Sequence, residues 1–127
     1  MENNEKYYAL LVGSRDFNNY NLFMKKCDYF LSNYSDIVVV SGGARGTDAL
    51  AKRYAKDKGY EYIEFPAEWD RFGKRAGFIR NQQMHKFIAE KSKRGVIAFW
   101  DGQSKGTQHN FDLAKSYDNP LRIVRYK

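Results

Sequence analysis

Cysteine, histidine and proline are scarce in this chain of 127 residues. The one cysteine, Cys27, excludes an internal disulfide and a cysteine metal cluster, and its neighbours KKCDYF favour a packing position on a helix. His85 and His109 lack a second ligand at metal spacing, so we expect no metal site and no cofactor. With only two prolines and 43% hydrophobic residues, the composition excludes a disordered or low-complexity chain.

Long hydrophobic runs are also missing. No segment approaches the roughly 20 apolar residues that a membrane-spanning helix needs, and the N-terminal MENNEKYY lacks the apolar core of a signal peptide. We therefore expect a cytoplasmic protein with no membrane partner. The length is that of one ordinary domain, so we expect a single domain over 1–127.

Acidic residues are the minority among the charged ones, with 15 Asp and Glu against 22 Lys and Arg and a net charge of +7. This surplus favours anionic partners such as nucleotides, nucleic acids or phosphates, without choosing among them. Aromatic residues make up 17% and spread over the expected strands and helix faces, which is typical of packing. Exposed aromatics would also suit a homo-oligomer, which the sequence leaves open.

Apolar runs alternate with helical patterns along the whole chain. The pattern predicts helices near residues 20–33, 47–58, 76–92 and 107–117, between strands at Tyr7–Gly13, Asp36–Gly42, Tyr60–Pro66, Gly95–Gly102 and Leu121–Tyr126. Such alternation implies crossover units. The expected fold is a three-layer, Rossmann-like α/β domain with a mostly parallel five-stranded sheet.

Polar clusters follow four of these strands: GSRDF, SGGARGTD, PAEWDRFGKRAGFIRN and WDGQSKGT. Ligands of parallel sheets collect outside the carboxyl ends of the strands, so we expect the four loops to converge on one rim. The candidate ligand-binding residues in them, Arg80 and the carboxylates apart, are Gly13, Ser14, Arg15, Ser41, Gly42, Gly43, Ala44, Arg45, Gly46, Thr47, Trp69, Asn81, Trp100, Gly102, Gly106 and Thr107.

The glycine-rich loop stands directly before an expected helix. Glycine allows positive φ and close approach of the backbone, and a helix start presents free N–H groups, so Gly42, Gly43 and Gly46 predict a phosphate cradle. The alternative is plain capping of the helix by Thr47 or Asp48. The motif is neither a Walker loop nor the dinucleotide-binding fingerprint.

Arg80 and Asn81 interrupt the apolar stripe of the helix that starts at Ala76. A buried guanidinium needs an anion or acceptors, and we favour a ligand phosphate over Asp48 or Asp101. Asn81 is expected to fix a loop backbone. Gly106 and Thr107 predict a weaker anion site at a helix start.

The aromatics Trp69 and Trp100 lie best for stacking on a base, with core packing as the alternative for at least one of them.

Two strings carry a family resemblance: S-G-G-A-R-G-T-D and, from Ala76 to Met84, A-G-x-x-R-N-x-x-M. Together with VGSRDF and FWDGQSKGT they resemble the YspA/YpsA-related branch of the SLOG superfamily, from about Tyr8 to Ala114. The resemblance implies a Rossmann-like domain that binds nucleotides, nucleotide sugars or related derivatives.

Two relatives of that superfamily suggest different functions. DNA-processing protein A has a similar glycine loop and an R-N pair, and binds single-stranded DNA. The Lonely Guy phosphoribohydrolases use an arginine, matched here by Arg80, and a glutamate, at whose place Asn110 stands. The departure leaves open whether the chain is an enzyme at all. If it is a hydrolase of that type, Arg80, Asp48 and Asp101 are the candidate catalytic residues, with Glu68 as a further carboxylate at the rim.

We therefore expect the rim to bind a phosphate-bearing nucleotide or nucleotide derivative, and the sequence leaves open whether it cleaves an N-glycosidic or phosphate bond of that ligand. The alternative is a single-stranded nucleic-acid binding protein, which its basic charge favours.

Overall fold

The computed structural model describes residues 5–127 and contains one five-stranded sheet. Every pair of neighbouring strands is parallel, in the order β3-β2-β1-β4-β5. The strands are β1 (Tyr7–Gly13), β2 (Ile37–Ser41), β3 (Glu61–Glu64), β4 (Arg94–Trp100) and β5 (Leu121–Arg125). The expected Rossmann-like fold is confirmed, and its sheet is parallel throughout.

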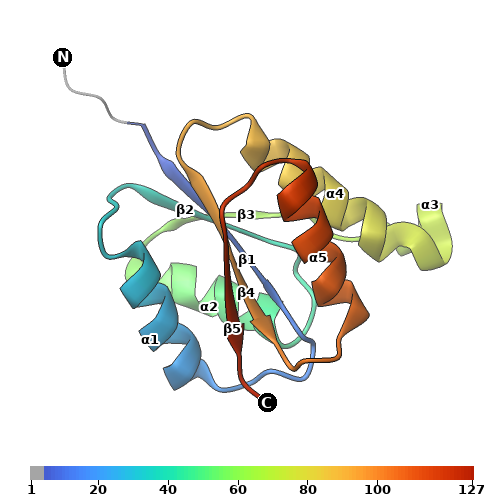
Figure 1. Ribbon diagram of the computed structural model, residues 1–127, viewed down its shortest axis with the longest axis horizontal. Helices are drawn as coiled ribbons and strands as arrows, with labels where there is room; N and C mark the ends of the chain where they lie inside the picture. Colours follow the sequence, from blue (N-terminus) through green and yellow to red (C-terminus); the bar gives the residue numbers. More distant parts are fainter. Residues whose placement is uncertain (1–4) are drawn as a thin grey trace.

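Helices cover both faces of this sheet (Figure 1). One face carries α1 (Tyr20–Leu31) and α2 (Thr47–Lys58), and the other carries α4 (Ala76–Ala89) and α5 (Lys105–Ser116). Two short elements, α3 (Trp69–Phe72) and the 3₁₀ turn η1 (Gly73–Arg75), lead into α4 and project at one end of the molecule. The sequence did not predict them, because four residues are too few to show a helical period.

The core has two halves, one on each face of the sheet. Alternate residues of β1 serve them: Ala9 and Leu11 face α1 and α2, while Leu10 and Val12 face α4 and α5. Because the central strands are buried on both faces, their sequences are continuous apolar runs. Cys27 is fully buried on α1, as the sequence predicted.

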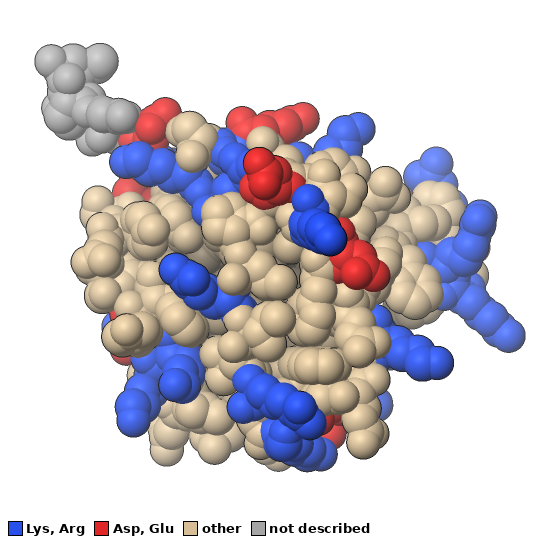
Figure 2. All heavy atoms as spheres, viewed as in Figure 1, with Lys and Arg blue, Asp and Glu red and all other residues tan. Residues whose placement is uncertain are grey.

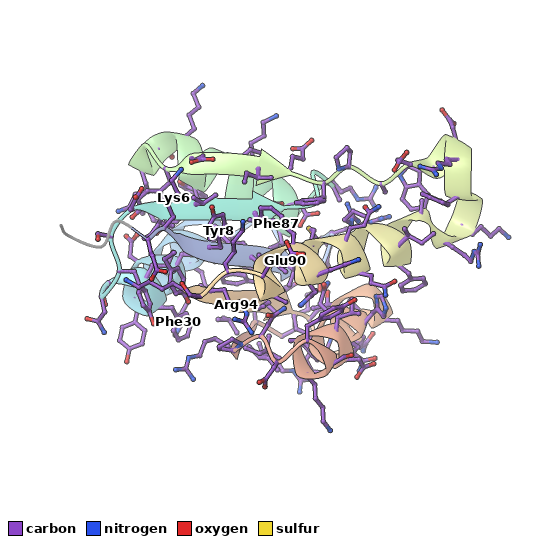
Figure 3. All side chains as sticks on the ribbon, turned by 90° about the horizontal axis from the view of Figure 1, so that it is seen from above. Lys6, Tyr8, Phe30, Phe87, Glu90 and Arg94 are labelled. Atoms are coloured by element: carbon purple, nitrogen blue, oxygen red, sulfur yellow. The ribbon has the colours of Figure 1, made fainter. Side chains whose placement is uncertain are left out.

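The second half of the core reaches toward the N-terminal ends of the strands. Tyr8 of β1 and Phe87 of α4 pack edge to face there, with ring centroids 5.8 Å apart (Figure 3). Phe65, which follows β3, continues this contact at 5.4 Å from Phe87. α4 is thereby anchored along β1, and its first turns extend to the opposite end, where the polar loops lie.

The strand order creates a switch point between β1 and β4. The chain leaves β1 toward α1 on one face and leaves β4 toward α5 on the other, so the two loops diverge and open a crevice between them. Ser14 and Asp101, the polar residues at these two strand ends, meet across it: the Asp101 N–H donates to Ser14 Oγ at 3.3 Å. Within 5–127, no helix has the length and apolarity to cross a membrane.

Candidate functional site

A cavity of about 460 Å³ opens at the carboxyl ends of the strands. Its wall includes Arg15 from the loop after β1, Arg45 and Asp48 from the β2–α2 connection, Trp69 of α3, and Arg80 of α4. The size is that of a small-molecule site, which typically measures a few hundred cubic ångströms. The prediction that these loops converge on one rim is confirmed.

The glycine loop after β2 folds tightly against the rest of the protein. Gly43 and Gly46 have φ of +74° and +73°, a conformation that side chains with a Cβ rarely adopt. A Cβ on Gly46 would collide with the backbone of Arg15, and one on Gly43 would lie 2.5 Å from the carboxyl carbon of Glu64. The glycines therefore allow close packing inside the protein.

The amide groups of this loop remain largely available. The Thr47 N–H donates to Ser14 O at 3.2 Å and the Ala44 N–H donates to Asp48 Oδ2 at 3.1 Å. The N–H groups of Arg45, Gly46, Asp48 and Ala49 donate no hydrogen bond to any described residue. They form the positive end of α2, which suits an anion. Neither Thr47 nor Asp48 caps α2 through its side chain, so the capping alternative does not explain the loop.

Arg80 is the buried cation of the site, with 7% of its surface exposed. Its Nη1 donates to Gly42 O at 2.6 Å and approaches Phe65 O at 3.5 Å, and its Nε donates to Asn81 Oδ1 at 3.0 Å. No carboxylate of the described chain lies within 4 Å of it, contrary to the alternative of a pair with Asp48 or Asp101. Arg80 rather than Asn81 holds the loop backbone.

Asp48 is the acid that compensates the charge of Arg80 most strongly. Burial raises the pKa of its carboxyl, while the Ala44 amide and the guanidinium groups of Arg80 and Arg15 act in the opposite direction. Burial in turn lowers the pKa of the Arg80 guanidinium, which stays charged because arginine remains protonated in proteins. The cavity wall thus holds three arginines, Arg15, Arg45 and Arg80, and one largely buried acid, Asp48.

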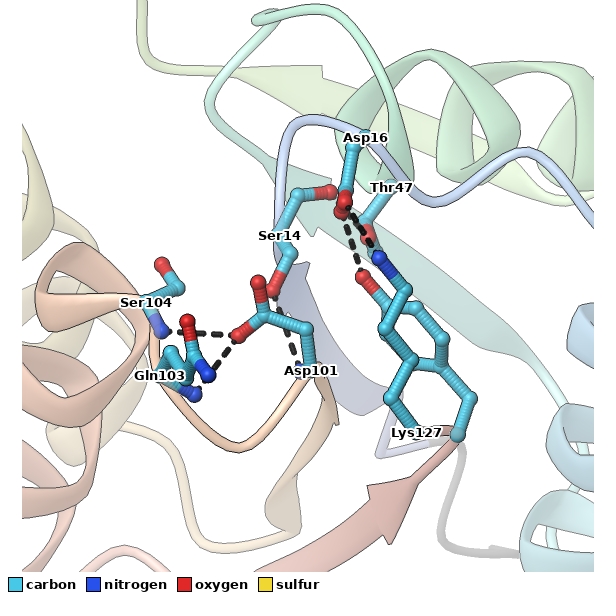
Figure 4. Close-up of polar contacts among 8 residues, drawn as sticks. Ser14, Asp16, Thr47, Asp101, Gln103, Ser104 and Lys127 are labelled. Atoms are coloured by element: carbon cyan, nitrogen blue, oxygen red, sulfur yellow. Dashed lines mark hydrogen bonds and ion pairs between the residues drawn. The ribbon is translucent and has the colours of Figure 1, made fainter.

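Ser14 joins three segments at the floor of the site. Its carbonyl oxygen accepts from Thr47 Oγ1 at 2.9 Å, and its side chain accepts from the Asp101 N–H (Figure 4). Thr47 is fully buried, so its hydroxyl supports the loop after β1 instead of facing the cavity.

The C-terminal residues hold the loop after β1 from outside. Asp16 accepts from Tyr126 Oη at 2.7 Å and from Lys127 Nζ at 3.1 Å (Figure 4). These two hydrogen bonds lower the pKa of the Asp16 carboxyl. Because Arg15 precedes Asp16 directly, the contact also fixes the backbone that carries Arg15.

Asp101 is a turn residue with one oxygen committed to the backbone. Its Oδ1 accepts from the N–H groups of Gln103 at 2.8 Å and Ser104 at 2.7 Å, and these bonds lower the pKa of its carboxyl. An ionised carboxylate can accept hydrogen bonds from a ligand but cannot act as a general acid near neutral pH. Ser104 then caps α5 by accepting from the Thr107 N–H at 3.3 Å, which occupies one amide of the second predicted anion site.

The two tryptophans lie in different surroundings. Trp69 is 50% exposed, lines the cavity and has the Arg15 guanidinium 5.9 Å from its ring centroid. Trp100 packs edge to face on Phe111 at 5.3 Å and donates from Nε1 to Ser104 O at 3.2 Å. Trp100 does not line the cavity, so only Trp69 is placed to stack on a ligand.

A buried hydrogen-bond chain runs from Asn119 through His85 to Asn110, which lines the cavity. Asn119 Nδ2 lies 3.2 Å from His85 Nδ1; because this amide nitrogen can only donate, the ring proton is assigned to Nε2, which donates to Asn110 Oδ1 at 3.0 Å. Burial lowers the pKa of His85 to about 4, so the ring is neutral at pH 7. Asn110 Nδ2 donates to Gly106 O, and an amide fills the place of the hydrolase glutamate.

Most of the residues predicted from the sequence come together. The cavity wall contains Gly13, Ser14, Arg15, Ala44, Arg45, Asp48, Trp69, Arg80, Asn81, Asp101, Gly106 and Thr107. Gly42 and Gly43 line an adjoining depression. The residues that line neither are Ser41, Gly46, Thr47, Trp100 and Gly102, and the sequence-predicted carboxylate Glu68 also lies outside. Ser41 and Thr47 are fully buried, because a residue at a strand end or helix start can turn its side chain into the core.

Several wall residues were not predicted: Asp16, Lys74, Gly77, Phe78, Met84, Ser104 and Asn110. Lys74 comes from the 3₁₀ turn η1 before α4, which is too short to show a helical period, and Phe78 lies in the first turn of α4. Met84 lies one turn beyond Arg80 on α4 and ends the second string that carries the resemblance. Its spacing from Arg80 could have identified it.

Unpaired basic residues surround the cavity. Lys and Arg side chains project at the α3 end of the molecule and along its lower edge (Figure 2). Around the site, Arg15, Arg45, Lys74, Arg75 and Lys105 are exposed, and none has an ion-pair partner within the described chain. Such a field attracts polyanions.

Comparison with known structures supports the fold. DNA processing protein A from Helicobacter pylori, described for its single-stranded DNA binding mode, superposes with a TM-score of 0.71 at 19% identity, covering 97% of this chain and 67% of that one. DNA processing protein A from Streptococcus pneumoniae gives 0.73 at 18% identity, covering 97% of this chain and 54% of that one. This chain therefore spans about half to two thirds of those proteins.

Sequence comparison gives a nearer relation. The gene 61 protein of Mycobacterium phage D29 is 38% identical over 90 residues, which cover 67% of this chain and 69% of the phage protein. The YspA, cpYpsA-related SLOG family matches residues 10–72, from the middle of β1 to the end of α3. The S-G-G-A-R-G-T-D string lies within the matched residues, where β2 leads into α2, whereas the string from Ala76 to Met84 lies beyond them on α4. The chain belongs to the YspA, cpYpsA-related SLOG family.

Proposed function

We propose that the cavity binds a phosphate-bearing nucleotide, with a phosphate held by Arg15, Arg80 and the free amides at the start of α2. The proposal depends mainly on one observation, the burial and hydrogen bonding of the Arg80 side chain. It is 7% exposed, bonded only to neutral acceptors, and lines the cavity with a full positive charge. A buried cation of this kind is best compensated by an anion, and a guanidinium suits phosphate oxygens.

The rest of the wall suits a nucleoside. Trp69 and Phe78 offer aromatic faces, and Asn81 and Asn110 offer amide groups. The ionised Asp101 carboxylate can accept hydrogen bonds from sugar hydroxyls or a base amine.

Isothermal titration with purine and pyrimidine nucleoside monophosphates tests this function. Arg15→Ala is the first variant, because the Arg15 side chain makes no hydrogen bond within the described protein. Loss of a charge-assisted phosphate contact should weaken binding about tenfold to a hundredfold. Arg75→Ala removes an exposed arginine outside the cavity wall and should leave the affinity unchanged. Equal effects of the two variants would contradict the proposal.

Single-stranded nucleic-acid binding is the second candidate, and the structural comparisons support it more directly than the first. The protein from Helicobacter pylori that shares this fold binds single-stranded DNA. The unpaired cations around the rim and the exposed Trp69 are features that single strands use.

Oligonucleotide binding separates the two candidates. A single-strand binder should bind a 20-nucleotide strand far more tightly than a monophosphate, with affinity that falls steeply with salt. Arg75→Ala should then weaken binding of the strand while leaving the monophosphate unaffected. Oligonucleotide affinity that does not respond to salt would remove this candidate.

Cleavage of the bound ligand remains a prediction from the sequence. Asn110 and its neighbour His85 supply no ionisable acid near neutral pH at the position of the hydrolase glutamate. Of the carboxylates in the cavity wall, Asp48 and Asp101 are the candidates from the sequence, and Asp16 accepts hydrogen bonds from Tyr126 and Lys127. To test cleavage, chromatography should monitor the release of free base or phosphate from the nucleotide by wild type and by Asp101→Asn.

A further inference from the structure

A second cavity, of about 410 Å³, lies at the end of the sheet opposite the rim loops. It opens between the end of α1 and the N-terminal parts of β4 and β5, and none of its wall residues lines the larger cavity. Phe30 of α1 and Arg94 of β4, which belong to this wall, lie away from α3 in Figure 3. The volume is again that of a small-molecule site, and the function proposed above does not use it.

Tyrosine rings gather at this second cavity. Five large hydrophobic side chains are exposed in the described chain; two of them line the larger cavity, and Tyr29 and Tyr34 line this one. The ring of Tyr34 stacks on that of Tyr7, with centroids 3.8 Å apart and planes at 17°. Tyr7 covers one face of Tyr34, whose side chain is still 44% exposed. The stack can therefore accept a further flat ring.

The wall also carries two guanidinium groups, and none of its described residues is acidic. Within residues 5–127, the Arg122 side chain makes no hydrogen bond and no ion pair. Arg94 donates three hydrogen bonds, all to neutral oxygens, at 2.6 to 3.0 Å. The cavity thus holds two positive charges without a compensating acid, and the guanidinium of Arg122 is free to bind an anion.

Tyr7 adds a hydroxyl donor beside Arg122. Burial raises the pKa of Tyr7 to about 12, and the charge of Arg122 acts in the opposite direction, so the two groups are close enough to interact. The hydroxyl is protonated at neutral pH and can donate a hydrogen bond. A Cβ on Gly95 would collide with it, so this glycine allows Tyr7 to lie over β4. Carbonyl oxygens in the last turn of α1 already accept from Ser32 and Tyr34, which weakens the negative field of that helix end.

We propose that this cavity is a second binding site, which takes a planar aromatic compound carrying one carboxylate. The ring stacks on Tyr34, and the carboxylate lies against Arg122 with the Tyr7 hydroxyl as a further donor. A guanidinium binds a carboxylate through two parallel hydrogen bonds. One free guanidinium matches the single charge of a carboxylate better than the two charges of a phosphate monoester. The site is independent of the nucleotide proposed for the larger cavity.

Three matched probes test this site: 2-naphthoate, its neutral amide 2-naphthamide, and the aliphatic acid octanoate. Proton–nitrogen correlation NMR spectra of the labelled protein report both the affinity and the place of binding. We expect 2-naphthoate to shift the amide signals of Tyr34 and Gly95 and to leave those of Arg15 and Ala44 unchanged. It should bind at least about tenfold more tightly than 2-naphthamide, which lacks the charge, and about threefold or more above octanoate, which lacks the rings.

Arg122→Gln isolates the carboxylate contact. It should weaken binding of 2-naphthoate about tenfold, to the level of 2-naphthamide, and leave the amide itself unaffected. Arg125→Gln, the same change at an exposed arginine of β5 outside the cavity wall, is the matched control and should alter neither. Tyr34→Leu should weaken both aromatic probes. Thermal melts of the three variants confirm that they are folded.

Several results would overturn this inference. Signal shifts at Arg15 and Ala44 in place of Tyr34 and Gly95 would put the probe in the larger cavity. Equal affinity for 2-naphthoate and its amide, equal effects of the two arginine variants, or no binding of any probe would also contradict it.

UMP serves as the remaining probe, because aromatic and basic groups also suit a nucleotide. If UMP binds at Tyr34 and Gly95 more tightly than 2-naphthoate does, this cavity is a phosphate site and the carboxylate assignment is wrong. UMP that shifts only signals of the larger cavity supports two sites with different ligands. Failure of the naphthoate site leaves the nucleotide site at the carboxyl ends of the strands untouched.

Discussion

Arg80 Nη1 and the carbonyl oxygen of Gly42 lie 2.6 Å apart, in a hydrogen bond that ties α4 to the loop after β2. The same nitrogen lies 3.5 Å from Phe65 O, so one side chain joins the loops that follow two neighbouring strands. Since these acceptors are neutral, the contact fixes the guanidinium without cancelling its charge. The geometry of the glycine loop and the charge of the cavity thus depend on the same residue.

Arg80→Met should destabilise the protein by about 1–3 kcal/mol, because the carbonyl oxygen of Gly42 loses its donor in a buried setting. Urea unfolding monitored by circular dichroism measures the change. Arg80→Lys keeps the charge and should lose less stability. An unfolding free energy for Arg80→Met equal to that of wild type would show that the hydrogen bond is dispensable.

Gly42→Ala should also act through Arg80. The added Cβ would lie 2.7 Å from Cζ and 3.0 Å from Cδ of Arg80, so the guanidinium must move. We expect a loss of about 1–3 kcal/mol in unfolding free energy, as for other overpacked sites, together with weaker nucleotide binding.

Gly106→Ala is the matched control for this change, because Gly106 also lines the cavity but has open space where a Cβ would stand. It lies in the first turn of α5, where alanine favours the helix over glycine by up to about 1 kcal/mol. Gly106→Ala should therefore melt at or above the wild-type temperature. Similar destabilisation by both alanines would contradict the role assigned to Arg80.

Low pH should lower the free energy of unfolding, because the buried ring of His85 is neutral in the folded protein. Its pKa is about 4 in the folded protein against about 6.5 when unfolded, so the unfolded state binds more protons between these values. The stability that the neutral ring provides is complete above pH 6.5 and is lost as the pH falls toward 4, at about 1.4 kcal/mol per unit, or about 2 kcal/mol at pH 5.

Urea titrations at pH 7.5 and pH 5 check this dependence. His85→Gln should be less stable than wild type at pH 7.5 but should lose less on acidification, because glutamine does not titrate. His109→Gln is the control for the other histidine, which is only partly buried. If His85→Gln and wild type lose the same free energy on acidification, the buried neutral ring is not the cause.

Substitutions of the two tryptophans should have different effects, one on nucleotide affinity and the other on stability. Trp69→Leu should weaken nucleotide affinity with little effect on the melting temperature, since half of the indole surface is exposed. Trp100→Leu should lower the melting temperature, because it removes both the contact with Phe111 and the hydrogen bond to Ser104 O. Titration calorimetry and thermal melts on both variants give the comparison. Loss of affinity from Trp100→Leu alone would reverse the assignment.

The sequence by itself determined the layers and the place of the site. The apolar runs of β1, β2 and β4 are buried on both faces, so their composition alone marks them as central parallel strands. The glycine string was then found from its position after β2, and the Arg80–Asn81 pair from its place in the apolar stripe of α4. These features are local in the chain, and a local pattern can predict them.

Only the tertiary structure decided which side chains face the cavity. The direction of Thr47 and Trp100 depends on partners such as Ser14 and Phe111, which are distant in sequence or on another element. Two neutral acceptors of Arg80, Gly42 O and Phe65 O, lie 38 and 15 residues away in the sequence, and no periodicity encodes such contacts. Sequence fixes the kind of residue at each strand end, whereas packing of distant segments fixes the rotamer, the burial and therefore the charge that a ligand meets.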